Sequence, residues 1–180
     1  MNPELCAFHH LEDQFFTSVS VNKVDYGHLI AFKTGVPAAG LNPAFVNRID
    51  ENIHYALAAC SDDYKNNQVP WSLVIPDYLF NQYLEHELQA HHFIEQGTGV
   101  AMMLELSNYR GSFSQANLRC QLMSDDLDTW SIPLIEGFKS TADITSVYTQ
   151  RHKHALSCTP SMFHFSGYYE DQIVSSLTLS

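Results

Sequence analysis

The spacing of apolar and polar residues predicts strands and helices that alternate along the chain. Apolar, aromatic and β-branched residues are concentrated over residues 15–24 and 29–32, and they predict two strands. Asp25-Tyr26-Gly27 between them predicts a turn. A weaker strand is predicted over residues 44–46. The N-terminal part of the chain is therefore expected to be mainly strand.

Four further elements are predicted in the first half of the chain. Apolar residues recur at helical spacing over residues 50–66 and predict an amphipathic helix. The nearly continuous apolar segment 70–75 predicts a strand that is buried on both faces, in the centre of its sheet. A second helix is predicted from Asp77 toward Gly97, followed by a strand over residues 100–106.

The second half opens after a polar connector at residues 107–115, which contains a glycine. We place a domain boundary near residue 112, so that residues 1–111 and 112–180 form two units. The second unit is predicted to begin with a half-buried strand at 118–122, followed by a helix that Ser124 caps and Pro133 breaks or kinks.

The last elements are a helix and a hairpin. The capping-box spacing of residues 140–143 predicts the start of a helix, and the apolar residues that follow recur at helical spacing. Residues 162–168 and 173–179 predict the two strands of a terminal β-hairpin.

Composition narrows the class of protein. Of the 180 residues, 45% are hydrophobic and 16% charged, so the chain can bury a core without disulfides or a metal. With the alternating elements this predicts an α+β or α/β fold, in which helices flank a mixed central sheet. The formal net charge of −11 opposes binding to nucleic acid or anionic membranes. No apolar segment resembles a membrane helix or a signal peptide, which predicts a cytoplasmic protein.

The spacings of the cysteine and histidine residues do not match those of metal ligands. The four cysteines are scattered and predict reduced thiols. His86 and His91 flank Glu87, but they are five positions apart rather than the four that a zinc-binding helix requires. His9-His10 lies in a polar, terminal stretch. We therefore predict no metal site.

The order of elements in the first unit is informative as a whole. From Asn42-Pro43 onward the chain has a helix, a Trp-containing apolar strand that ends in proline (70–76), and a helix that closes near Gly97. A strand containing Met103 follows. In this order the unit resembles the N-terminal half of tandem GNAT-type N-acetyltransferases. The resemblance implies a degenerate GNAT-like sheet in residues 1–111.

The second unit is similar to the beginning of a C-terminal GNAT domain. A strand precedes a helix that contains Trp130, then come a helix with Tyr148 and the hairpin 164–177. The resemblance implies acetyl-CoA-dependent acyl transfer to a small-molecule or peptide amine. It implies no catalytic residue that can be assigned here. Tyr168 and Tyr169 are the candidates for contacting substrate, because the corresponding hairpin lines the acceptor side in such folds.

The sequence departs from the family at the cofactor site. GNAT enzymes hold the CoA pyrophosphate with a glycine-containing turn at a helix N-terminus. The corresponding corner, residues 46–52, has no glycine and contains Asp50 and Glu51, whose carboxylates repel a diphosphate. We therefore predict that this chain alone does not bind acetyl-CoA, although the complete enzyme would use it.

Two interpretations remain open. In the first, the chain is a portion of an acetyltransferase whose cofactor loop lies elsewhere. In the second, it is a non-catalytic binding or interaction module on a degenerate GNAT fold. Residues 174–180 are apolar or uncharged and contain no proline, so nothing protects this edge strand from pairing. This favours a truncated chain or a homodimer through the C-terminal strand.

Overall fold

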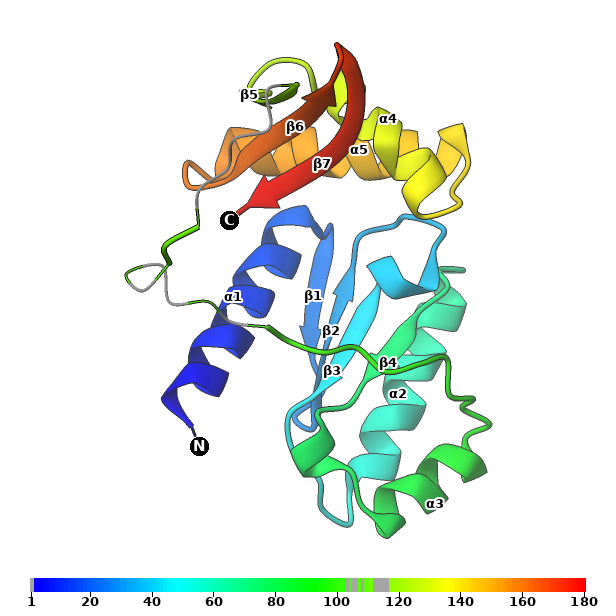
Figure 1. Ribbon diagram of the computed structural model, residues 1–180. Coiled ribbons are helices and arrows are strands. Elements are labelled where there is room, and N and C mark those ends of the chain that lie inside the picture. The colour runs from blue at the N-terminus through cyan, green and yellow to red at the C-terminus, as the bar shows by residue number, and fades with distance from the viewer. Residues whose placement is uncertain (1, 103, 105–106, 108, 112–116) are drawn as a thin grey trace.

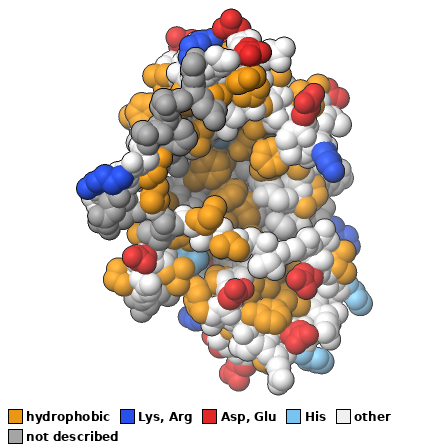
Figure 2. Space-filling model, in the orientation of Figure 1, with side chains coloured by type: hydrophobic (Ala, Val, Ile, Leu, Met, Phe, Trp, Pro, Cys, Tyr) orange, Lys and Arg blue, Asp and Glu red, His pale blue; other side chains and the backbone are white. Residues whose placement is uncertain are grey.

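The computed structural model describes residues 2–102, 104, 107, 109–111 and 117–180 (Figure 1). In these ranges the chain is a mixed α+β protein with five α-helices, a four-stranded mixed sheet and a three-stranded antiparallel sheet. The four-stranded sheet belongs to an N-terminal lobe and the three-stranded sheet to a C-terminal lobe. Figure 2 shows apolar side chains gathered around a hollow near the middle of one face. The predicted boundary near residue 112 falls among residues 112–116, which lie outside the described residues.

The chain begins with a helix, α1 (Pro3–Val19), where the sequence had predicted a strand from residue 15. The Asn2 side chain caps it by accepting a hydrogen bond of 2.9 Å from the Glu4 N–H, and Pro3 stands at the first helical position. Only Asn22–Asp25 form a strand, β1. The strand prediction over residues 15–19 was wrong because Phe15, Phe16 and Val19 pack at helical spacing.

The four-stranded sheet has the order β1-β2-β3-β4. β2 (Leu29–Lys33) pairs antiparallel with β1 and with β3 (Pro43–Val46), which confirms the predicted strands at 29–32 and 44–46. The turn between β1 and β2 is also confirmed, with Gly27 at φ +81° and its N–H 2.7 Å from an Asp25 carboxylate oxygen. Helix α2 (Ile53–Asn66) covers one face of the sheet, where its apolar side buries against β2 and β3.

Strand β4 (Ser72–Val74) runs parallel to β3 after the α2 crossover. It lies at the edge of the sheet and none of its residues is fully buried, so the prediction of a central strand buried on both faces was wrong. The apolar run has another cause. Trp71 stacks on Tyr64 with ring centroids 4.9 Å apart, and Leu73 and Ile75 pack on the same side against the core. One face of β4 thus supplies the apolar signal, while the Val74 side chain is exposed.

The predicted helix from Asp77 is divided in two. A 3-10 helix η2 (Asp77–Leu79) comes first, and α3 (Gln82–Ala90) begins after Asn81, whose side chain accepts a hydrogen bond from the Leu84 N–H. The helix ends well before Gly97 because His92 adopts a left-handed φ of +60°. Residues 100–102 and 104 are not in a strand, contrary to prediction. The rest of that predicted strand, residues 103 and 105–106, lies outside the described residues.

The C-terminal lobe places helices α4 (Leu127–Gly137) and α5 (Ala142–Cys158) on one face of the sheet β5-β6-β7 (Figure 1). The predicted hairpin is confirmed as β6 (Phe163–Tyr169) and β7 (Gln172–Leu179). β5 (Leu118–Leu122) is a strand as predicted, but all five of its residues are exposed because it forms an outer edge. β7 forms the other edge, so its pairing with a second copy stays a prediction.

Helix α4 begins at a different cap from the predicted one, and it is not broken at Pro133. Asp126, rather than Ser124, caps it by accepting a hydrogen bond of 3.0 Å from the Thr129 N–H. Pro133 lies inside the helix, which continues to Gly137. Trp130 before the proline and Leu134 after it pack in the same apolar cluster, and this packing holds both halves of the helix together.

One buried side chain, Asn42, holds the segments that lead into β3 and β4. Its Oδ1 accepts hydrogen bonds from the N–H and hydroxyl of Thr34, both at 3.0 Å, and from the Gly35 N–H at 3.2 Å. Its Nδ2 donates, at 2.8–3.0 Å, to the carbonyl oxygens of Val36, Ala38 and Pro70. Asn42 has no solvent exposure, so this amide satisfies backbone groups that water does not reach.

Replacing Asn42 should therefore destabilise the N-terminal lobe. We expect Asn42→Ala to lower the free energy of unfolding by roughly 2–4 kcal/mol, because it leaves several buried donors and acceptors unpaired. Urea denaturation followed by circular dichroism measures this change. Asn66→Ala, at an exposed position of α2, is the matched control and should change stability by less than about 0.5 kcal/mol. Equal effects of the two substitutions would contradict this role of Asn42.

The core of the C-terminal lobe contains a pair of buried histidines. His152 Nδ1 of α5 lies 2.7 Å from His164 Nε2 of β6, and the Trp130 ring lies against both imidazoles. Burial lowers the pKa of His152 to about 3, with a further contribution from His164, and burial lowers the pKa of His164 to about 4. Both imidazoles are thus neutral in the folded protein at pH 5, where an unfolded histidine, with a pKa near 6.5, is protonated.

This pair predicts a loss of stability in acid. Since the folded pKa values lie below the unfolded value, the stabilisation is complete above pH 6.5 and is lost as the pH falls below it. At pH 5 the loss is up to about 2 kcal/mol per histidine. Urea denaturation at pH 7.5 and 5.0 gives the free energy of unfolding at each pH. The difference between the two values, the pH effect, should be smaller in His164→Leu than in the wild type. His154→Gln, at an exposed position of α5, should retain the wild-type effect. An unchanged pH effect in His164→Leu would disprove the assignment.

Candidate functional site

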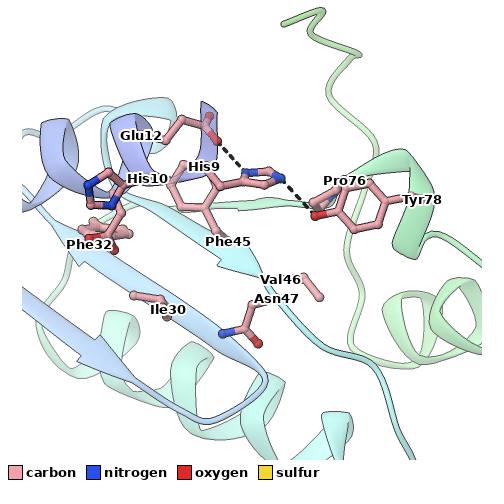
Figure 3. Close-up of a pocket in the computed structure, with 11 residues that line it drawn as sticks. His9, His10, Glu12, Ile30, Phe32, Phe45, Val46, Asn47, Pro76 and Tyr78 are labelled. Carbon is pink, nitrogen blue, oxygen red and sulfur yellow. Dashed lines mark hydrogen bonds and ion pairs between the residues drawn. The ribbon is translucent and has the colours of Figure 1, made fainter. Parts of the chain in front are cut away.

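A pocket of about 300 Å³ opens between α1 and the face of the four-stranded sheet that α2 leaves uncovered (Figure 3). Its floor comes from alternate positions of two strands, Ile30 and Phe32 of β2 and Phe45 of β3, which point away from α2. Helix α1 supplies one wall. The remaining lining residues, Val46, Asn47, Pro76 and Tyr78, lie where β3 and β4 end.

Aromatic rings shape the apolar part of this pocket. The ring centroids of Phe32 and Phe45 are 5.8 Å apart, and Phe16 of α1 lies 5.7 and 5.4 Å from them. These contacts fix α1 against the sheet, and they explain why residues 15–19 form a helix. The pocket floor is therefore built by the same aromatic packing that holds α1 against the sheet.

Polar side chains gather on the α1 side of the pocket. Glu12 Oε2 lies 3.1 Å from His9 Nδ1, one helical turn away, and His9 Nε2 lies 3.0 Å from the Tyr78 hydroxyl (Figure 3). Tyr78 reaches His9 because Pro76 ends the β4 segment and η2 turns the chain back toward α1. Burial raises the pKa of Glu12, and the hydrogen bond to His9 opposes this shift. Burial also raises the pKa of Tyr78, so this phenol remains protonated.

The charge of the pocket is negative. Glu12 and Asp13 line it, and no lysine or arginine is among its described lining residues. Asp13 is already paired with Lys23 at 2.6 Å, and the Lys23 ammonium lies 5.3 Å from the Phe32 ring centroid. Among the residues that the structure describes, Glu12 has the His9 imidazole as its one ion-pair partner. The pocket thus offers one carboxylate that no arginine or lysine of the described chain neutralises.

Tyr168 and Tyr169, the substrate contacts predicted from sequence, lie in the other lobe. The Arg119 guanidinium lies 4.3 Å from the Tyr168 ring centroid, and both side chains line a shallow hollow beside the β6-β7 turn. Tyr169 is the last residue of β6 and is 45% exposed. Neither tyrosine lines the pocket beside α1. Their contact with substrate stays a prediction, and sequence reasoning missed His9, Glu12 and Tyr78.

The corner at residues 46–52, where a GNAT enzyme has its CoA-binding turn, contains the carboxylate of Asp50. Asp50 Oδ1 accepts a hydrogen bond of 2.9 Å from the Asn52 N–H and lies 2.7 Å from His28 Nε2. Arg48 Nε lies 3.5 Å from the other carboxylate oxygen. The hydrogen bond from the Asn52 N–H, followed by the contact with His28, lowers the pKa of Asp50. The Asp50 carboxylate thus lies just before the start of α2, where its negative charge opposes the binding of an anion.

Metal-ligating side chains do not cluster in the described part of the chain. No three side chains of His, Cys, Asp or Glu come together there in a way that could hold an ion. The four cysteines are free thiols, and only Cys60 is buried. No helix in the described ranges is both long and apolar enough to cross a membrane.

Comparisons with known proteins found no protein-family model, no curated protein and no solved structure that matches this chain. The chemistry of the pocket is therefore argued from its own residues.

Proposed function

We propose that the pocket between α1 and the four-stranded sheet binds a small organic amine, as its cation, with an apolar body. The observation that carries this proposal is the combination of the Glu12 carboxylate with an aromatic floor formed by Phe32 and Phe45. A carboxylate attracts an ammonium group, and aromatic faces attract both the cation and its hydrocarbon. The volume of about 300 Å³ suits a ligand of roughly the size of a phenylalkylamine.

The proposal includes a role for this amine as the acceptor in acyl transfer, in line with the resemblance to GNAT-type N-acetyltransferases. Two features support a GNAT-like N-terminal lobe. Three antiparallel strands are followed by the α2 crossover and the parallel strand β4, and the pocket lies where β3 and β4 end. In this proposal residues outside this chain hold acetyl-CoA. The alternative is a binding module that uses the same pocket without chemistry.

The amine proposal is tested by a matched pair of ligands. We expect 2-phenylethylamine to bind at pH 7.5 about tenfold more tightly than 2-phenylethanol, because only the amine carries a charge for Glu12. Isothermal titration calorimetry measures both dissociation constants. Glu12→Gln should remove most of the preference and leave the alcohol unaffected.

The control for this experiment is Glu85→Gln, which removes an exposed carboxylate of α3 outside the pocket. It should retain the wild-type preference for the amine. Equal affinity of the wild type for the two ligands, or an equal loss of preference in both variants, would refute the assignment to Glu12.

A second prediction concerns acetyl-CoA. We expect no change in melting temperature with acetyl-CoA at concentrations up to about 1 mM, because the Asp50 carboxylate lies just before the start of α2 and repels a diphosphate. A bound ligand at a hundredfold excess over its Kd would stabilise the fold by about 2.7 kcal/mol, which differential scanning fluorimetry detects. A saturable rise would show that a cofactor site exists within this chain and would favour a complete transferase over both alternatives.

A further inference from the structure

The side chains of Glu12, His9 and Tyr78 form a hydrogen-bonded chain along one wall of the pocket (Figure 3). Glu12 and His9 come from α1 and are 26% and 31% exposed, while Tyr78 comes from η2 and is 51% exposed. Tyr78 and His9 are 69 positions apart in the sequence. The hydroxyl at the end of this chain therefore lies beside the pocket, and its second hydrogen-bonding position remains open to a ligand.

The direction of the hydrogen bonds follows from the first member of the chain. An ionised carboxylate only accepts, so the His9 nitrogen that faces Glu12, Nδ1, carries the proton. A neutral imidazole then has a lone pair on its other nitrogen, Nε2. The Tyr78 hydroxyl must use its single proton to donate to that lone pair. The Tyr78 oxygen is left with lone pairs only, and it can accept but not donate toward a ligand.

We propose that Tyr78 determines the specificity of this pocket: its hydroxyl donates to His9 and accepts from ligands that present an N–H or O–H group. The inference rests on the proposed function of the same pocket and adds the class of ligand group that it selects. An amine satisfies the requirement, since each of its N–H groups is a donor. A carbonyl or ether oxygen in the same place would face another acceptor.

The carboxylates of Glu12 and Asp13 line the same pocket and favour cations whatever Tyr78 does. The role of Tyr78 is therefore measured with uncharged ligands.

Indole and benzofuran are matched probes of this preference. They have nearly the same shape, but indole presents an N–H donor where benzofuran presents a weakly accepting oxygen. We expect indole to bind the wild type about fivefold more tightly at pH 8, the effect of one neutral hydrogen bond. Calorimetric titration gives the ratio of the two dissociation constants.

A substitution at Tyr78 assigns the effect to its hydroxyl. Tyr78→Phe should bring the ratio of the two dissociation constants close to one. His86→Gln, which changes an exposed histidine of α3, should behave as the wild type. A preference for indole that survives in Tyr78→Phe, or equal binding of the two probes by the wild type, would overturn the inference.

A second measurement requires no ligand. Long-range ¹H–¹⁵N correlation spectra of the labelled protein at pH 8 should show His9 as the Nδ1–H tautomer, and Glu12→Gln should weaken that preference. An Nε2–H tautomer in the wild type would also overturn the inference. The two proposals can fail separately: if 2-phenylethylamine binds through Glu12 but the two probes bind equally, amine binding stands and the role of Tyr78 falls. If neither probes nor amine bind, both fall.

Discussion

The N-terminal lobe depends on the buried amide of Asn42. Its six hydrogen bonds connect the segment after β2, the start of β3 and the residue that leads into β4. Pro70 is 28 positions from Asn42, whereas the other partners are within eight positions, and the side chain can satisfy all of them only in one arrangement. The order of the strands, and with it the place where β3 and β4 end, is thereby fixed. The pocket lies at that place, so its shape follows from a residue that does not line it.

Much of the fold could be predicted from local pattern. In helix α2 and in the terminal hairpin, apolar residues recur with a regular spacing, and the side that packs in the fold agrees with that spacing. The errors arose where packing overrode a local signal. The aromatic residues of 15–19 favour a strand by propensity, but contacts with Phe32 and Phe45 hold Phe16 on a helix. The apolar run before Pro76 indicated a central strand, although one face of an edge strand is enough to produce it.

The candidate site was harder to predict than the fold. Once α1 is known to be a helix, the spacing of His9 and Glu12 places them on one side of it, but the sequence alone had suggested a polar terminal stretch. Tyr78 joins them only through the turn after β4, and no short motif records a contact across 69 positions. The tyrosines chosen by resemblance, Tyr168 and Tyr169, lie on a different sheet. Local pattern thus predicts elements better than it predicts which of their side chains meet.

Helix α1 belongs to both lobes, and this has a consequence for cooperativity. Phe16 contacts the aromatic floor of the pocket, while Phe15 lies 6.0 Å from the buried His152 ring and Val19 packs with Ala155 and Met162. The Thr159 hydroxyl donates to Ser18 across the same junction at 3.3 Å. A ligand that holds α1 against the sheet also favours the docked C-terminal lobe, and by thermodynamic reciprocity the docked lobe favours the ligand. The contacts of this one helix therefore couple the stability of each lobe to the other.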